Sequence, residues 1–224
     1  MSYTSTGLDW RLRNYLITPD VAVCANTGAV RQIPFALFTP LVGTITFEEF
    51  VIGTTNPIYP RATYGGGPGT PSNVRCGEFF LNQAFAGNPL LVDLNIAAPP
   101  PVIDYVSILA RIVNDGARPG NPAAFAGSPG FNGPQAFVFD EDVVGVKFNV
   151  GFANVLNSIT INVFDRNATV LFSTTNDWVG YKDVCFNRDS NIANIAAVQF
   201  SVDTALEGGT GFSIKNIQFS QTCA

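Results

Sequence analysis

Residues 143–152 read VVGVKFNVGF and residues 158–165 read SITINVFD, and these two segments decide the fold. In both, apolar side chains alternate with polar or small ones, and β-branched and aromatic residues are frequent. This is the pattern of strands that bury one face. The residues between them include two asparagines, which is typical of a turn. The two segments therefore predict consecutive strands of a β-sheet.

Further segments of the same kind lie on both sides of this pair. They are TITFEEF (44–50), VIDYVSILARIV (102–113), TVLFS (169–173), AAVQFSV (196–202) and GFSIKNIQF (211–219). Short strands at intervals of roughly 8–12 residues, with Gly, Asn and Asp between them, are typical of a β-sandwich or barrel. No segment has a sustained apolar period of a helix, so little helix is expected. The turn from Asp165 to Thr169 is expected to form a hairpin, and the 19 phenylalanines to fill the core.

Residues 1–40 differ from the rest of the chain. DWRLRNYLI (9–17) alternates loosely and then meets Pro19, which indicates an arm or an edge strand. Such an arm packs either on its own domain or on a neighbour, and the sequence leaves both alternatives open. Residues 41–224 are expected to form a single β-sandwich domain, since no repeat divides them.

The composition excludes several classes of function. The chain has 12 basic and 17 acidic residues and no basic cluster, so it lacks the positive face that a nucleic acid requires. It contains no histidine, which removes Ser–His–Asp and Cys–His catalysis and most zinc sites. Glu48 and Glu49 are neighbours in an expected strand and so point to opposite faces, not toward each other. The sequence predicts a protein that is not an enzyme.

A transmembrane segment is not expected. The longest weakly charged apolar stretch, from Ile33 to Ile45, is too short to span a bilayer and is interrupted by Pro34, Pro40 and Gly43. Charged residues make up only 13% of the chain, against roughly 25% in an average soluble protein. A surface so poor in charge favours a crowded or self-associating setting.

The four cysteines, Cys24, Cys76, Cys185 and Cys223, are widely spaced. No two have the spacing of a metal site or a redox motif, and an even, dispersed set favours two disulfides and an oxidising compartment. Three pairings are possible. We expect Cys24–Cys223, which would tie the two ends, and Cys76–Cys185, which would tie the core. Four buried free thiols are the alternative.

An ordered set of motifs resembles bacterial exported jelly-roll domains, including those of surface and matrix proteins with PEP-CTERM sorting tails. The motifs are GTITFEEFVIGT (43–54), GVKFNVGFAN (145–154), ITINVFD (159–165) and GFSIKNIQF (211–219). The resemblance implies a galactose-binding-like jelly roll, similar to carbohydrate-binding modules and mostly non-catalytic. We therefore expect an all-β, antiparallel β-sandwich (jelly roll) with an N-terminal arm.

The resemblance also bears on calcium. In such domains an acid of the opening strand and an aspartate of the last strand often hold a structural Ca²⁺. Glu48 and Glu49 match the first acid, but Lys215 stands where the aspartate is expected. An ammonium there would repel a cation, so a structural calcium is either absent or bound elsewhere. We expect Lys215 to form an ion pair with Glu48 or Glu49; three unrelated, exposed side chains are the alternative.

Two polar segments offer further candidate sites. The acidic cluster of Asp140, Glu141 and Asp142 follows an apolar strand and supplies carboxylates that suit calcium, unless it is a solvated turn. Asn167 begins the sequon Asn-Ala-Thr in an expected turn, which makes it a possible glycosylation site in a glycosylating host.

A third segment suggests a sugar site. Trp178 and Tyr181 supply aromatic faces for the apolar side of a sugar ring, and Asn176 and Asp177 supply groups that bind hydroxyls. The competing interpretation is that Trp178 covers the edge of the sandwich.

These observations favour an extracellular or cell-surface protein that binds a polysaccharide or a cell-surface glycan without catalysis. The alternative is a structural subunit of an extracellular fibre, sheath or virion, which would assemble with copies of itself through the β-sandwich and the arm. Jelly rolls form shells readily, and the low charge of the chain suits both hypotheses.

Overall fold

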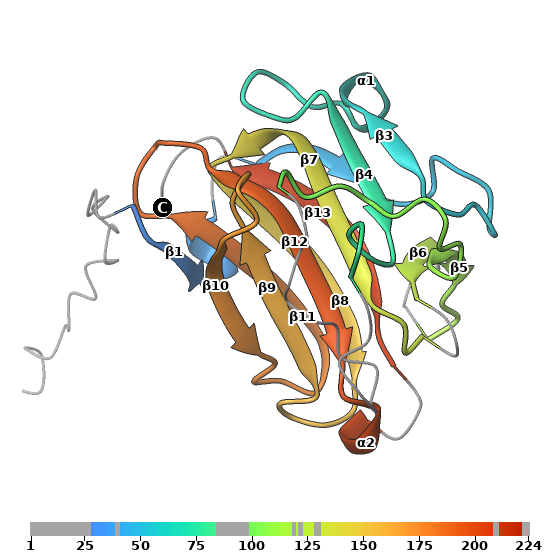
Figure 1. Cartoon of the computed structure of the whole chain (residues 1–224). Coiled ribbons are helices and arrows are strands. Elements are labelled where there is room, and N and C mark those ends of the chain that lie inside the picture. The colour runs from blue at the N-terminus through green and yellow to red at the C-terminus, as the bar shows by residue number, and fades with distance from the viewer. Residues whose placement is uncertain are drawn as a thin grey trace, which may run out of the picture.

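The computed structural model describes residues 28–38, 41–83, 99–117, 120, 123–127, 131–207 and 211–220, and almost all of its regular structure is β (Figure 1). Its helices are single turns, and none in the described part of the chain is long and apolar enough to cross a membrane. The elements are β1 (Val30–Ile33), η2 (Phe35–Leu37), β2 (Leu41–Ile45), β3 (Ile58–Pro60), α1 (Arg61–Tyr64), β4 (Asn73–Gly77), β5 (Arg111–Asn114), β6 (Ala123–Ala126), β7 (Gln135–Val143), β8 (Gly145–Ala153), β9 (Ile159–Phe164), β10 (Val170–Thr175), β11 (Gly180–Arg188), β12 (Ile195–Val202), α2 (Thr204–Glu207) and β13 (Ser213–Ser220).

Two antiparallel sheets pack face to face. The larger sheet has seven strands in the order β1-β11-β8-β13-β6-β5, with β2 also paired to β13, and the smaller has six in the order β10-β9-β12-β7-β4-β3. When β6 to β13 are numbered 1 to 8, the sheets contain the orders 1-8-3-6 and 2-7-4-5. Successive strands therefore mostly alternate between the sheets, as in a jelly roll. The predicted antiparallel β-sandwich is confirmed.

The core between the sheets is rich in phenylalanine, as the sequence predicts. Phe148 of β8 lies with its ring centroid 5.1 Å from that of Phe137 on β7 and 5.0 Å from that of Phe200 on β12, and all three are fully buried. Burying such a side chain contributes roughly 1.5–3 kcal/mol relative to leaving it exposed. Because side chains alternate along β8, the neighbours Lys147 and Asn149 lie on the outer face of the larger sheet.

Three local predictions need correction. The strand expected over 44–50 ends at Ile45, because Phe47 adopts a positive φ of 66° and residues 46–50 turn. The strand expected over 102–113 is confined to Arg111–Asn114, with an isolated bridge between Ile103 and Phe80 before it. The nine-residue strand β11 was not predicted, since polar residues interrupt its apolar alternation.

The hairpin predicted at the turn from Asp165 to Thr169 is confirmed. The strands β9 and β10 that flank the turn pair with each other in antiparallel register. The Asp165 carboxylate accepts the backbone N–H groups of Asn167 and Thr169 at 2.9 and 2.8 Å, which fixes the turn locally.

Part of the segment before residue 41 belongs to the sandwich itself. Val30–Ile33 pairs with β11 of the same chain, and η2 follows directly. Ile33 and Phe38 pack with Cys185 in a small apolar cluster on the outer side of the larger sheet. The stretch 9–17, predicted to be an arm or edge strand, lies outside the described residues.

The predicted disulfide between Cys76 and Cys185 is wrong, because both are buried free thiols. Cys76, on β4 of the smaller sheet, packs into the core between the sheets, whereas Cys185, on β11, packs on the outer side of the larger sheet. Sheets stack about 10 Å apart, and a disulfide requires Cα atoms within about 7 Å. Burial raises the pKa of both thiols, that of Cys185 to about 12. Cys24 and Cys223 lie outside the described residues.

Candidate functional site

Polar side chains gather on the outer face of the larger sheet. Strand pairing places Asp183, Asn149 and Lys215 in one row across β11, β8 and β13. The pairing places Gln218 opposite both Lys147 and Thr44 in the next row. Because alternate residues of these strands fill the core, their polar neighbours gather here.

Hydrogen bonds join these side chains into a network. The Asp183 carboxylate accepts the Asn149 amide at 2.9 Å and lies 3.2 Å from the Lys147 ammonium. Lys147 also donates to Gln218 at 3.0 Å, and Gln218 donates to Thr44 at 2.9 Å. Lys147 is only 6% exposed. A charge so buried is tolerated only when it is paired and hydrogen-bonded, which this network achieves.

The ion pair expected at Lys215 is present. Its ammonium, on a side chain that is 11% exposed, lies 3.3 Å from the Glu48 carboxylate. Glu49 has a different role, because its carboxylate accepts the backbone N–H of Thr46 at 2.9 Å and the Thr46 hydroxyl at 3.0 Å. Glu48 and Glu49 thus lie in a turn and not on a strand, and only Glu48 reaches the outer face.

A groove of about 460 Å³ opens beside this network, and we call it the Phe35 groove. Its volume falls within the roughly 300–1,000 Å³ of small-molecule sites. The short helix η2 holds Phe35 over the sheet, where 44% of the residue is exposed and the Lys147 ammonium lies 4.1 Å from the ring centroid. The groove is lined by Gln32, Ile33, Pro34, Phe35, Asp177, Lys182 and Asp183.

The polar lining of the Phe35 groove is charged and paired. The Lys182 ammonium lies 2.5 Å from the Asp177 carboxylate, and this hydrogen bond lowers the pKa of Asp177. Asp183 is paired with Lys147 on the other side. The groove therefore sets hydrogen-bond donors and acceptors beside an exposed aromatic ring, and its charges nearly balance.

The sugar site predicted at Asn176–Tyr181 is not formed as a set. Trp178 is 8% exposed and belongs to the core, so it has no free face for a sugar ring. Asn176 is fully buried: its carbonyl accepts the N–H of Ile159, and its amide donates to the carbonyls of Val155 and Trp178, each at 2.8 Å. The bond to Ile159 ties the loop to β9. Of the predicted set, Asp177 lines the Phe35 groove.

The fourth member, Tyr181, lies toward a second cavity. Its ring packs edge-on against Phe152 with centroids 5.1 Å apart. It also covers Gly151 so closely that a Cβ at that position would lie 1.8 Å from the ring. Glycine is therefore required at 151 for Tyr181 to lie flat on the sheet.

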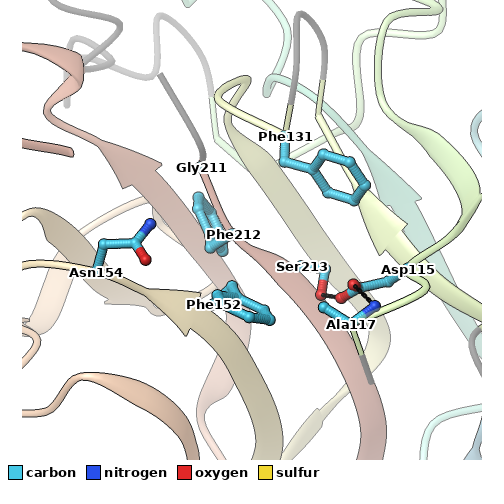
Figure 2. Close-up of a pocket in the computed structure, with 8 residues that line it drawn as sticks. All are labelled: Asp115, Ala117, Phe131, Phe152, Asn154, Gly211, Phe212 and Ser213. Atoms are coloured by element: carbon cyan, nitrogen blue, oxygen red, sulfur yellow. Dashed lines mark hydrogen bonds between the residues drawn. The ribbon is translucent and has the colours of Figure 1, made fainter. Parts of the chain in front are cut away.

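The second cavity, which we call the end pocket, has a volume of about 230 Å³ (Figure 2). Phe131, Phe152 and Phe212 supply its apolar walls, and Asp115 and Ser213 lie at one side. The Ser213 hydroxyl donates to the Asp115 carboxylate at 2.6 Å. The end pocket is smaller and more apolar than the Phe35 groove, so it suits a small apolar group.

Glu207 positions one wall of the end pocket. This residue of α2 is 3% exposed, and its carboxylate accepts both the backbone N–H and the side-chain amide of Asn154, at 2.7 and 2.8 Å. Its other oxygen accepts the Ser158 hydroxyl at 2.5 Å. Asn154 lines the pocket, so its orientation there depends on Glu207.

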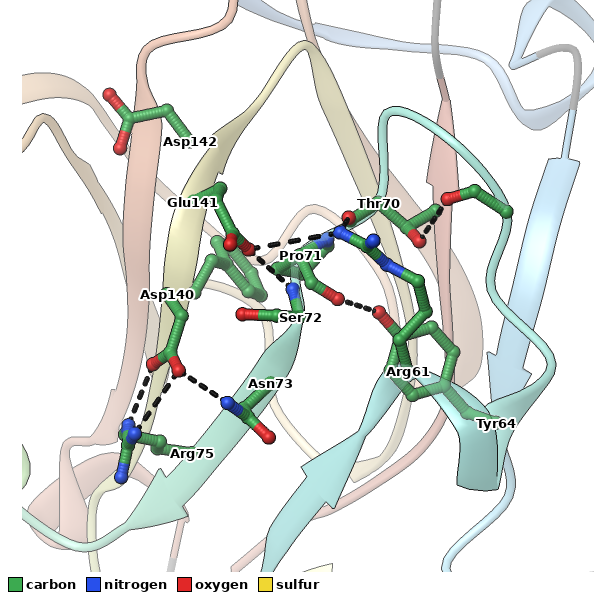
Figure 3. Close-up of polar contacts among 12 residues, drawn as sticks. Arg61, Tyr64, Thr70, Pro71, Ser72, Asn73, Arg75, Asp140, Glu141 and Asp142 are labelled. Atoms are coloured by element: carbon green, nitrogen blue, oxygen red, sulfur yellow. Dashed lines mark hydrogen bonds and ion pairs between the residues drawn. The ribbon is translucent and has the colours of Figure 1, made fainter.

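The predicted calcium cluster at residues 140–142 is wrong. Consecutive residues of β7 point to alternate sides, so the three carboxylates diverge (Figure 3). In the part of the chain that the structure describes, no group of three acidic or cysteine side chains is placed to hold a metal. Each carboxylate has its own arginine: Asp140 pairs with Arg75 at 2.7 Å, Glu141 with Arg61 at 3.9 Å, and Asp142 with Arg166 at 2.5 Å.

The Asp140 pair predicts a loss of stability in acid. Burial tends to raise the pKa of Asp140, but the hydrogen bonds from Arg75 and Asn73 outweigh it, and the pKa is lowered. A carboxyl group whose pKa is lower in the native state than in the unfolded state stabilises the fold at pH values above the unfolded pKa of about 3.9. This contribution is lost as the pH falls through the native pKa. Asp140→Asn should therefore be less stable than the wild type at pH 6, and the gap should shrink at pH 2.5. Urea unfolding at both pH values measures this; an equal gap would contradict it.

Asn167 is exposed in the turn between β9 and β10. The sequon is therefore accessible, which is what an acceptor for glycosylation requires. Its modification stays a prediction.

No protein-family model matches the sequence, and no curated protein is similar enough to indicate a relationship. The resemblance to exported jelly-roll domains consequently rests on the ordered motifs in the sequence, three of which coincide with β8, β9 and β13.

Proposed function

We propose that this protein is a non-catalytic binding module that recognises a glycan outside the cell through the Phe35 groove. The observation that carries the proposal is an exposed phenylalanine set beside paired carboxylates and ammonium groups on the face of a jelly roll. The apolar face of a sugar ring packs on an aromatic ring, while its hydroxyls exchange hydrogen bonds with charged and amide groups. Gln32, Asp177 and Lys182 supply such groups.

The charges of the groove favour a neutral glycan. The carboxylates of Asp177 and Asp183 are matched by the ammonium groups of Lys182 and Lys147. An acidic polysaccharide would meet the carboxylates of Asp177 and Asp183, and a cationic one would meet the ammonium group of Lys182. A neutral sugar instead hydrogen-bonds to both, because charged donors and acceptors make the stronger hydrogen bonds.

The groove offers a poor setting for glycoside hydrolysis. A glycosidase needs a carboxylic acid with a raised pKa as its proton donor. Lys182 has the opposite effect on Asp177, whose pKa is lowered. Asp183 is engaged by Lys147 and Asn149. Binding without turnover is the function that this arrangement supports.

A paired substitution tests the proposal. Phe35→Ala should weaken binding to a neutral glycan about tenfold, or roughly 1.4 kcal/mol, because the aromatic face is lost. Phe152→Ala is the matched control, since Phe152 is similarly exposed (37% against 44%) but lines the end pocket. Glycan-array screening of the wild type, followed by calorimetric titration of the best neutral oligosaccharide, gives the affinities.

The affinities of the two variants show whether the glycan binds in the Phe35 groove or in the end pocket. Equal binding by Phe35→Ala and the wild type, with loss of binding in Phe152→Ala, would move the site to the end pocket and contradict the proposal. Absence of binding to every glycan on the array would contradict glycan recognition itself. Melting temperatures of both variants control for unfolding.

A further inference from the structure

Two buried oxygen atoms lie close to Ser107 and lack hydrogen-bond partners within the described part of the chain. They are Oε1 of Glu78 and Oδ1 of Asn56. Glu78 follows directly after β4 and is fully buried. Its other oxygen accepts the Ser107 hydroxyl, while the Asn56 amide donates to the Ser107 carbonyl at 2.7 Å. One residue therefore anchors both side chains and leaves an acceptor of each unsatisfied.

Ser107 joins three segments of the chain, and the strands next to these segments, β3, β4 and β5, lie on one side of the sandwich (Figure 1). Asn56 Oδ1 lies 3.3 Å from where a Cβ would stand at Gly77, the residue before Glu78. On the other side, the backbone N–H of Asp104 donates to the carbonyl of Phe79 at 2.9 Å. Asn56 lies before β3, Glu78 after β4 and Asp104 before β5, and their segments are joined by the bonds to Ser107 and Phe79.

The electrostatics at Glu78 leave a negative charge without compensation. Glu78 is fully buried, and within the described residues its Oε1 has no hydrogen-bond partner and no arginine or lysine pairs with its carboxylate. An ionised carboxylate in such a position is costly unless a cation compensates it. The ion pairs around this sandwich are elsewhere, at residues such as Arg75 and Lys215.

We propose that Glu78, Asn56 and Asp104 bind a hard divalent cation, with calcium as the fitting ion. All three donors are oxygens, which calcium prefers, and carboxylate and amide oxygens are among its usual ligands. Two carboxylates balance its charge. This site is distinct from the position at Lys215, where an ammonium already neutralises Glu48.

The cation would fasten an exposed loop. In residues 102–109, Val106 is 89% and Ile108 61% exposed, so these side chains contribute little packing. The loop is held instead by the buried Ile103, by the backbone bond from Asp104 to Phe79, and by the bond from Ser107 to Glu78. A cation shared by Glu78 and Asp104 would join the loop to the end of β4.

Thermal unfolding in calcium tests the site. For a dissociation constant of about 0.1 mM, typical of extracellular calcium modules, 10 mM Ca²⁺ lowers the unfolding equilibrium constant about 100-fold. We expect a rise in Tm of roughly 5–10 °C over EDTA for the wild type. Glu78→Gln should fold in EDTA, because its amide can donate to Asn56, and should lose the response. Glu141→Gln, an exposed carboxylate outside the site, should respond like the wild type.

Terbium luminescence is the second measurement. Tb³⁺ should be sensitised in the wild type and displaced by Ca²⁺, and Asp104→Asn should weaken its binding at least tenfold. This readout applies even to a variant of low stability. A wild type whose Tm is equal in Ca²⁺ and EDTA would overturn the proposal and point to a protonated Glu78 that donates to Asn56. A calcium response retained in Glu78→Gln would overturn it as well.

Discussion

Trp178→Ala is expected to lower the free energy of unfolding by about 3–5 kcal/mol, the usual cost of removing a large buried aromatic side chain. Trp178 is 8% exposed and packs in the main core. The loss should therefore appear in stability, while the folded fraction keeps its glycan affinity.

Chemical denaturation of the wild type and Trp178→Ala, followed by far-UV circular dichroism, measures the change. Trp178→Phe is the matched control, because it keeps an apolar ring and should recover more than half of the loss. A variant of wild-type stability that no longer binds glycan would contradict the assignment of Trp178 to the core and restore it as a sugar platform.

Glu207→Ala is expected to cost about 1–3 kcal/mol, the usual penalty when a buried polar group loses a hydrogen-bond partner. The buried donor is the Ser158 hydroxyl, whereas the backbone N–H and amide of Asn154 belong to an exposed residue and can bond to water. Ser158 also donates to the carbonyl of Val155 at 2.8 Å, so part of the penalty is avoided. The side of the end pocket at Asn154 should loosen.

Glu207→Gln separates this effect from simple packing. Its carbonyl can still accept from Asn154, so its loss of stability should be under half of that in Glu207→Ala. Urea unfolding gives the stabilities, and amide hydrogen exchange at Asn154 reports the local opening. Equal stability of Glu207→Ala and the wild type would show that Glu207 does not hold this end of the sandwich.

The strands near the C-terminus were predictable because their pattern is local. VVGVKFNVGF alternates between the core and the outer face, and β8 follows it closely. The ion pair between Glu48 and Lys215 was predictable for another reason: the resemblance aligned two positions that lie 167 residues apart. The turn at Phe47 was not, because a positive φ at a phenylalanine has no signal in the alternation.

The Phe35 groove was missed because long-range pairing creates it. Phe35 lies in a segment interpreted as part of an arm, and it meets Asp177 and Lys182 only because β1 pairs with β11. The disulfide prediction failed for a similar reason. Which side of a sheet Cys185 faces depends on the register of β11, and β11 itself was not predicted. A signal was present in Lys147 and Asn149, whose polarity within a strand indicated that the outer face of this sheet is polar.

Two-dimensional NMR titration of the wild type with the neutral oligosaccharide that binds best on the array tests the central claim most directly. The Phe35 groove predicts that the largest changes in amide chemical shift fall at Gln32, Phe35, Lys182 and Asp183, which lie in or beside β1 and β11. Shifts concentrated at Asn154 and Ser213, around the end pocket, or the absence of any shift at saturating sugar, would contradict it.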